Sequence, residues 1–165
     1  MSTNQQTAGW DVDVPHGWTI VDPPAGIALL AFEPEQDGAT FRSNLVVTHQ
    51  PRTGGPDADV AGEPSVERVN GYVDELLDAL EANLPEAIVM GVWTAGRSDT
   101  TPERLATQRV LLGYRTPDGA EVEMLQQHVW LDTEIVTVTA TVPADVDDVM
   151  IDTLNACLES VTPAR

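Results

Sequence analysis

The chain of 165 residues contains no lysine, and its eight basic residues are all arginine, against 27 aspartate and glutamate residues. The formal net charge at pH 7 is therefore -19. A surface of this charge repels the phosphates of nucleic acids and anionic lipid headgroups. We therefore expect no nucleic-acid partner and no peripheral membrane role. Two origins of the missing lysine stay open, a GC-rich coding bias and a high-salt habitat.

Cysteine and long apolar runs are scarce as well. Cys157 is the single cysteine, which excludes an intramolecular disulfide, and its place in an apolar helical stripe predicts a buried, unreactive thiol. No apolar run approaches the roughly 18 residues that cross a bilayer. The N-terminal residues show neither the pattern of an export signal nor a lipobox cysteine. These absences predict a cytoplasmic protein without membrane insertion, and they leave non-classical secretion open.

Sequence motifs of catalysis and metal binding are also missing. The chain has no nucleophile elbow, phosphate-binding loop or dinucleotide fingerprint. Its histidines, His16, His49 and His128, do not follow the spacing of metal ligands. Asp57 and Asp59 lack the glycine and the distal glutamate of a calcium loop. We therefore expect no catalytic residues, no metal site and no cofactor, and hence a protein that is not an enzyme.

Short strands separated by proline and glycine are predicted for the first half of the chain. They cover residues 10–14, 18–21, 27–32 and 41–50. Residues 51–63 are rich in glycine and proline, and they predict a mobile loop rather than a linker between domains. Residues 1–9 are predicted to be a disordered N-terminal segment, and residues 10–165 a single domain.

The clearest helix is predicted for residues 65–84. Pro64 suits its first turn, and Pro85 ends it. Gly71 inside the helix costs about 1 kcal/mol relative to alanine, which a close crossing against a sheet or a tolerated accident would explain equally well. The apolar stripe, which recurs at spacings of three and four, consists of Val66, Val69, Val73, Leu76, Leu77, Leu80 and Leu84.

Four more strands are predicted after this helix, over residues 87–95, 105–115, 121–131 and 135–142. A tight turn at residues 116–119 joins two of them. Valine and threonine alternate in the last strand, which indicates one dry and one wet face. In the third strand the apolar parity slips between Met124 and Leu125, which suggests a bulge.

A final helix is predicted for residues 143–161, with Asp145, Asp147 and Asp148 in its first turn, where the helix dipole favours them. Consecutive strands that are joined by short turns pair antiparallel. Amphipathic helices bury their apolar stripes on such a sheet. The predicted fold class is therefore α+β, an antiparallel β-sheet with amphipathic helices packed on it.

Two motifs, Pro15-His16-Gly17-Trp18 and Phe41-Arg42-Ser43-Asn44-Leu45-Val46-Val47, precede the predicted helix, meander and closing helix. In this arrangement the chain resembles the Mog1/PsbP-like superfamily from Trp10 onward, and most of all its actinobacterial LpqN-type branch. The resemblance implies a Mog1/PsbP-like sandwich without enzymatic chemistry that binds proteins. LpqN-type members are often lipoproteins, whereas this chain has no lipobox. The related DUF1795 secretion chaperones cradle effector proteins, so the resemblance also implies a secretion- or envelope-associated adaptor or chaperone.

Arg42 and Asn44 are candidate binding residues because they share one face of their predicted strand. A cation is rare in this acidic chain, and here it would grip an anion or a carboxylate on an open sheet face. An internal ion pair with one of the many carboxylates is the alternative. The same two interpretations apply to Arg109 and Arg115, which share a parity on their strand.

Trp93, His128 and Trp130 are the other candidate binding residues. In the first hypothesis the protein is a binding module that holds an unidentified protein on a concave sheet face or by strand addition at an edge. In the alternative it is an enzyme or binds a small ligand, with a pocket between sheet and helix around these three residues. A broad apolar groove would favour the module, and an enclosed pocket with convergent polar groups would favour the alternative. A homodimer is left open.

Overall fold

The computed structural model describes residues 2–7, 9–52, 64, 66–84, 86–96 and 105–163. From residue 53 onward, the loop predicted for residues 51–63 lies outside the described residues, as do Asp57 and Asp59. The elements follow one another in the order β1 (Ser2–Thr7), β2 (Trp10–Pro15), β3 (Thr19–Val21), β4 (Ile27–Phe32), β5 (Asn44–Pro51), α1 (Val66–Asn83), β6 (Ile88–Ala95), β7 (Ala106–Arg115), β8 (Glu121–Trp130), β9 (Glu134–Pro143), α2 (Asp148–Ser160) and β10 (Thr162–Pro163).

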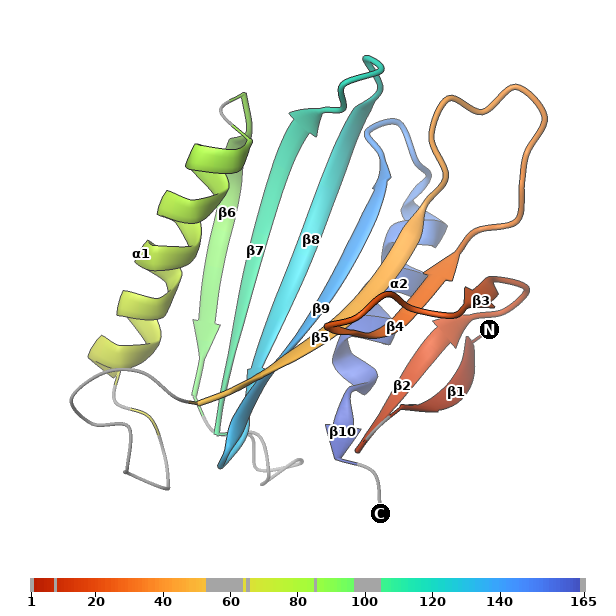
Figure 1. Ribbon diagram of the computed structural model, residues 1–165. Helices are drawn as coiled ribbons and strands as arrows, with labels where there is room; N and C mark the ends of the chain where they lie inside the picture. Colours follow the sequence, from red (N-terminus) through yellow and green to blue (C-terminus); the bar gives the residue numbers. More distant parts are fainter. Residues whose placement is uncertain are drawn as a thin grey trace.

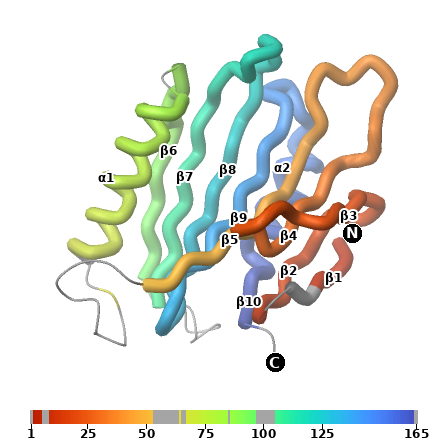
Figure 2. The backbone as a smooth tube through the Cα atoms, viewed as in Figure 1, coloured from red at the N-terminus to blue at the C-terminus, as the bar shows by residue number. Residues whose placement is uncertain are grey.

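The described strands form a large sheet and a small one (Figure 1). The large sheet has seven strands in the order β3-β4-β5-β9-β8-β7-β6, and every neighbouring pair is antiparallel. In the small sheet β2 lies between β1 and β10, so the first and last strands of the chain belong to the same sheet (Figure 2). The α+β fold class predicted from the sequence is confirmed, including the meander of β7, β8 and β9.

Helices α1 and α2 cover opposite faces of the large sheet, which we call the α1 face and the α2 face. On the α2 face, β2 and α2 together cover the middle of the sheet. The valines of β9 point to this face, and its threonines point to the other. The buried residues of this core are Trp10, Val12, Val14, Leu29, Ala31, Leu45, Val47, Val129, Leu131, Val136, Val138, Ala140, Val142, Leu154, Cys157, Leu158 and Val161.

On the α1 face, helix α1 packs over β7 and β8. Val69 lies against Trp130 and Ala106, while the leucines of the predicted stripe pack against Val110 and Leu112. A Cβ at Gly71 would have no neighbour within 4 Å, so no close crossing explains this glycine. Of the two explanations offered by the sequence, the one that remains is a glycine that the helix tolerates without a packing reason.

The bulge predicted between Met124 and Leu125 is wrong. Strand β8 keeps one register with β7 and with β9 along its whole length. Both faces of β8 are covered, one by each helix, so apolar residues follow one another without a shift of the backbone. The register shifts lie elsewhere, between Ile27 and Leu29 in β4 and between Val89 and Gly91 in β6.

Two predicted boundaries differ at the chain ends. Residues 2–7, expected to be disordered, form β1, which pairs with β2 from Ser2 opposite Pro15 onward. Helix α2 begins at Asp148 rather than residue 143, because Pro143 is still paired with Val122 and Asp147 caps the helix. Among the described residues, no helix is long and apolar enough to cross a membrane.

Candidate functional site

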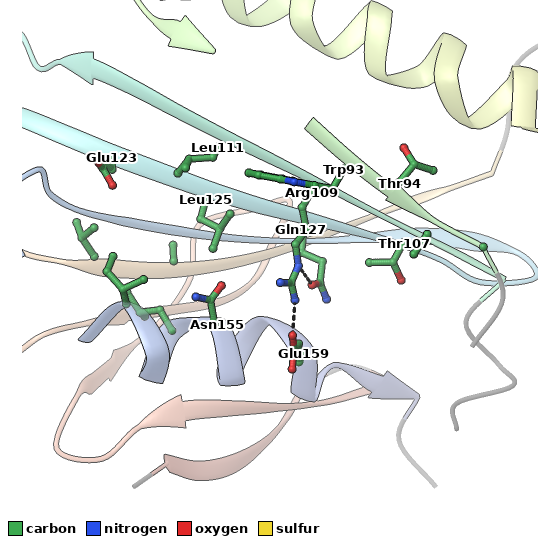
Figure 3. Close-up of a pocket in the computed structure, with 16 residues that line it drawn as sticks. Trp93, Thr94, Thr107, Arg109, Leu111, Glu123, Leu125, Gln127, Asn155 and Glu159 are labelled. Carbon is green, nitrogen blue, oxygen red and sulfur yellow. Dashed lines mark hydrogen bonds and ion pairs between the residues drawn. The ribbon is translucent and has the colours of Figure 1, made fainter. Parts of the chain in front are cut away.

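The candidate site is a groove on the α2 face, between helix α2 and the edge strand β6 (Figure 3). It has a volume of about 1030 Å³. The groove exists because α2 and β2 cover the central strands, whereas β6 and β7 extend past the helix on this face. Side chains from β6, β7, β8, β9 and α2 therefore line one depression in the sheet.

The floor of this groove is apolar. Leu111 and Leu125, which face each other across β7 and β8, form its centre. The remaining apolar lining comes from β9 and from the sheet-facing side of α2, through Ala140, Val142, Ile151 and Leu154. Such a surface binds a ligand mainly by removing apolar area from water.

Arg109, Gln127 and Glu159 gather at one end of the groove, where the sheet approaches the end of α2, whereas Glu123 lies toward the other end (Figure 3). Arg109 Nε donates a hydrogen bond to Gln127 Oε1 at 2.7 Å, and Arg109 Nη2 forms an ion pair with Glu159 Oε1 at 2.9 Å. The buried Gln127 amide in turn donates to the Leu158 carbonyl oxygen. Arg109 thus fixes α2 to the sheet, as the ion-pair interpretation predicts; Arg115 likewise pairs with Glu121.

Trp93 stands on the rim formed by the edge strand β6, beside its cross-strand partner Arg109. Its side chain lines the groove, and the residue is 53% exposed. The indole lies over the backbone of Gly91, because a Cβ at Gly91 would approach its Cη2 and Cζ2 atoms to 2.5 and 2.7 Å. A residue with a side chain at position 91 would displace this indole. The glycine therefore allows a large, accessible aromatic surface at the rim.

His128 and Trp130 lie on the other face of the sheet from Trp93. Trp93 is opposite Arg109 of β7, whereas His128 is opposite Gln108, and neighbouring residues of one strand point to opposite faces. The pocket that the sequence suggested around these three tryptophan and histidine residues is therefore not formed. The register between neighbouring strands decides on which face each residue lies, and this register cannot be derived from the sequence of one strand alone.

His128 is buried beneath α1. Its Nδ1 lies 2.8 Å from Thr137 Oγ1 and 3.5 Å from the Tyr72 hydroxyl, and the Tyr72 ring meets the imidazole edge-on. Among the described residues, its Nε2 has no hydrogen-bond partner. Burial lowers the pKa of His128 to about 4, so the ring is neutral at pH 7. Trp130 is buried beside it, and its indole also meets Tyr72 edge-on.

Arg42 and Asn44 lie at the start of β5, near the turn that follows β4. Arg42 donates from Nε and Nη2 to the Glu33 carbonyl oxygen at 2.9 and 2.6 Å, and its guanidinium lies 5.1 Å from the centre of the Phe32 ring. Its ion pair with Glu35 is longer, at 3.5 Å. The main-chain bonds make Arg42 a brace of this turn. Asn44, which begins β5, is half-buried.

The remaining titratable candidates do not converge. His49 pairs with Glu134 at 3.4 Å, on the strands β5 and β9. Cys157 lies on the buried side of α2, and burial, reinforced by the charge of Asp13, raises the pKa of its thiol to about 11. In the part of the chain that the structure describes, no three His, Cys, Asp or Glu side chains come together as metal ligands.

Comparison with solved structures identifies the fold. Cyanobacterial PsbP (CyanoP) from Synechocystis sp. PCC 6803 matches with a TM-score of 0.68 at 12% identity, over 99% of this chain and 92% of that one. LpqN of Mycobacterium tuberculosis, a protein involved in cell envelope biogenesis, matches with a TM-score of 0.63 at 15% identity, over 99% and 91%. The chain has a Mog1/PsbP-like fold.

A third structure agrees with this assignment. PA94, a protein of unknown function from Pseudomonas aeruginosa, matches with a TM-score of 0.62 at 15% identity, over 99% of this chain and 98% of that one. No protein-family model matches the chain, and it matches no curated protein in sequence. The fold resemblance predicted from the sequence is confirmed, and identities this low speak to the fold alone.

Sequence reasoning named Trp93 but missed most of the groove. Gln127, Asn155 and Glu159 carried no signal, because they reach the site from β8 and α2, far along the chain from β6. Glu159 lies 50 residues from its partner Arg109. The shared parity of Arg109 with Leu111 was the available clue, since it places both residues on one strand face.

Proposed function

We propose that this protein is a non-enzymatic protein-binding module that holds its partner in the groove between β6 and α2. The observation that carries the proposal is the combination of an apolar floor with the exposed indole of Trp93 at the rim. Aromatic side chains of this kind are enriched where proteins meet, because one rigid ring buries a large area at a small entropic cost. Charged groups lie at the two ends of the groove, with Arg109 and Glu159 at one and Glu123 toward the other.

The polar groups of the groove support binding rather than catalysis. Arg109 is already bonded to Gln127 and Glu159, and Gln127 to the main chain of α2. A catalytic site needs polar groups that are free to meet the reacting atoms. His128, the titratable residue that the alternative hypothesis requires, lies beneath α1 on the opposite face. These placements favour the module over a pocket enzyme.

The volume of the groove supports an occupant larger than a metabolite. Small-molecule sites usually enclose about 300–1,000 Å³ and bury most of the ligand. This groove, at about 1030 Å³, lies just above that range and reaches the edge of the sheet. A segment of another protein chain, laid along Leu111 and Leu125 with a side chain against Trp93, fits such a shape.

The test begins with capture of partners from native lysate on immobilised wild-type protein and on two variants. Trp93→Ala removes the indole at the rim, and Val149→Ala changes a side chain on α2 that is 72% exposed and outside the groove. A protein that is retained by the wild type and by Val149→Ala, and lost on Trp93→Ala, is the candidate partner.

The captured partner is then titrated against all three proteins. We expect Trp93→Ala to weaken binding at least about tenfold, since central aromatic residues often contribute 2 kcal/mol or more. Val149→Ala should bind like the wild type. Equal affinity of all three proteins would contradict the groove as the binding surface, as would turnover of a substrate abolished by a change at His128.

A further inference from the structure

Strand β6 is an open edge of the large sheet. It ends the strand order next to β7, and in the described part of the chain no strand pairs with its outer side. Its eight residues, Ile88–Ala95, contain no charged side chain. Large apolar side chains are exposed along it on both faces of the sheet: Ile88, Val89, Met90, Val92 and Trp93, with exposed fractions from 40% to 70%.

The other described edges are protected in ways that β6 is not. Strand β3, at the far end of the same sheet, has only three residues and is followed by Asp22, Pro23 and Pro24. Strand β1 of the small sheet is uncharged like β6, but polar throughout. Natural proteins blunt exposed edges with short strands, proline or charge, because bare edges pair with other chains. The length and the composition of β6 are those of an edge strand that pairs with a further strand.

We infer that β6 pairs antiparallel with β6 of a second copy of this chain, which makes the protein a dimer with one continuous sheet. Among the contacts that two copies could make, the charge of the chain favours this one. Two copies that each carry a net charge of -19 repel each other over most of their surfaces. When two copies of an uncharged strand pair, no like charges lie opposite each other in any register. Each copy carries the same strand, so the contact is available on both sides. Closed two-fold dimers are also the commonest symmetric assemblies.

The register follows from symmetry and from the bulge. A two-fold axis between antiparallel strands sets one residue directly opposite its own copy. The middle of β6 falls between Gly91 and Val92, and the strand is irregular between Val89 and Gly91. Val92 is therefore the central residue that lies clear of the irregularity. With Val92 on the axis, Gly91 of each copy lies opposite Trp93 of the other.

This register suits the indoles as well. Each Trp93 already lies flat over a glycine backbone in its own strand. Opposite it in the dimer comes the Gly91 of the partner copy, which has no side chain to obstruct the ring. Aromatic side chains across from glycine stabilise paired strands by covering the exposed backbone. The dimer would bury part of both indoles and bring the two grooves together on one side of the joint sheet.

The first test measures molar mass by light scattering after size exclusion, at about 0.1 mM protein so that mass action favours association. The wild type should have twice the 17.8 kDa of one chain. Val92→Lys places two lysines opposite each other at the axis, and like charges in that position oppose pairing. We expect it to raise the dimer dissociation constant at least tenfold. Val149→Lys, which makes the same change on α2, should remain dimeric.

Thermal melting of each variant separates lost pairing from lost folding. If Val92→Lys does not fold, Val92→Glu takes its place, because it also sets two like charges opposite each other at the axis. A wild type with the mass of one chain overturns the inference, and so does a folded charged variant at position 92 that dimerises like the wild type. A monomer that loses a captured partner on Val92→Lys would instead assign the edge to another protein.

The second test fixes the register. Val92→Cys would put two thiols on residues about 4.5–5.5 Å apart at their Cα atoms, within reach of a disulfide. Oxidation should then yield a covalent dimer on a non-reducing gel, because the native Cys157 is buried. Val149→Cys should yield none. Absence of the covalent dimer from Val92→Cys overturns this pairing. Either failure leaves groove binding, measured with Trp93→Ala, intact.

Discussion

His128 shows how burial controls the chemistry of a single residue in this protein. The ring is held by Thr137 and Tyr72, with Nε2 left without a partner among the described residues. Protonation would place a charge in that buried layer. The pKa of about 4 in the folded protein compares with 6.5 for an exposed histidine, so the unfolded chain binds the proton first as the pH falls.

The free energy of unfolding should therefore contain a pH-dependent contribution from His128. Because the folded pKa is depressed, this contribution is constant above pH 6.5 and is lost progressively as the pH falls from 6.5 to about 4. Over that window the loss amounts to about 3 kcal/mol. Urea unfolding of wild type and His128→Gln from pH 7 to pH 4 measures it, because the carboxylates common to both proteins cancel. A constant difference between the two proteins would show that His128 is not buried in this way.

Gly71 gives a prediction of the opposite sign. A Cβ would meet nothing there, and the residue lies within helix α1. Gly71→Ala should therefore raise the free energy of unfolding by about 0.5–1 kcal/mol. Gly119→Ala is the control, because Gly119 has a φ of +91° in the turn before β8, and alanine there should destabilise the fold by about 1–2 kcal/mol. In urea unfolding, Gly71→Ala should be the most stable of the three proteins and Gly119→Ala the least stable, with the wild type between them. A Gly71→Ala variant that is less stable than the wild type would contradict the packing of α1.

At the scale of elements, the start of α2 depends on one side chain. Asp147 has extended backbone angles, and its carboxylate accepts a hydrogen bond from the Met150 amide at 2.8 Å. Asp147→Ala should lower the free energy of unfolding by about 1 kcal/mol. Asp145→Ala, two residues earlier and exposed, removes the same charge and should change it by less than about 0.5 kcal/mol. If both variants lose the same stability, charge rather than capping determines how α2 begins.

Elements whose own residues show a full helix or strand periodicity could be predicted from the sequence. Strand β4 has the predicted bounds, and α1 differs from its prediction only at its ends. Elements that depend on the strands and helices packed around them could not. Strand β1 is polar and becomes a strand only by pairing with β2, while the apolar run in β8 reflects covers on both faces. The groove could not be predicted for the same reason, since only the strand register places Trp93 beside Arg109 and on the opposite face from His128.

On the scale of the whole molecule, net repulsion should govern the response to salt. The ion pairs of the described residues are partly or largely exposed, so each contributes at most about 1 kcal/mol. Raising sodium chloride from about 0.01 M to about 1 M shortens the Debye length from roughly 30 Å to 3 Å and screens the charge of -19. The melting temperature should rise. A flat or falling midpoint would mean that the ion pairs outweigh the repulsion.

The molecule presents two faces to a partner, and we propose that it uses the α2 face. One face carries the groove beside β6, and the other carries Arg42 and Asn44 near the β4–β5 turn. Hydrogen–deuterium exchange, measured on the protein with and without the captured partner, separates them most directly. We predict added protection along Ile151–Glu159 of α2, since pairing with a second copy already protects the amides of β6 in the free protein. Protection confined to residues 30–44 would contradict the account.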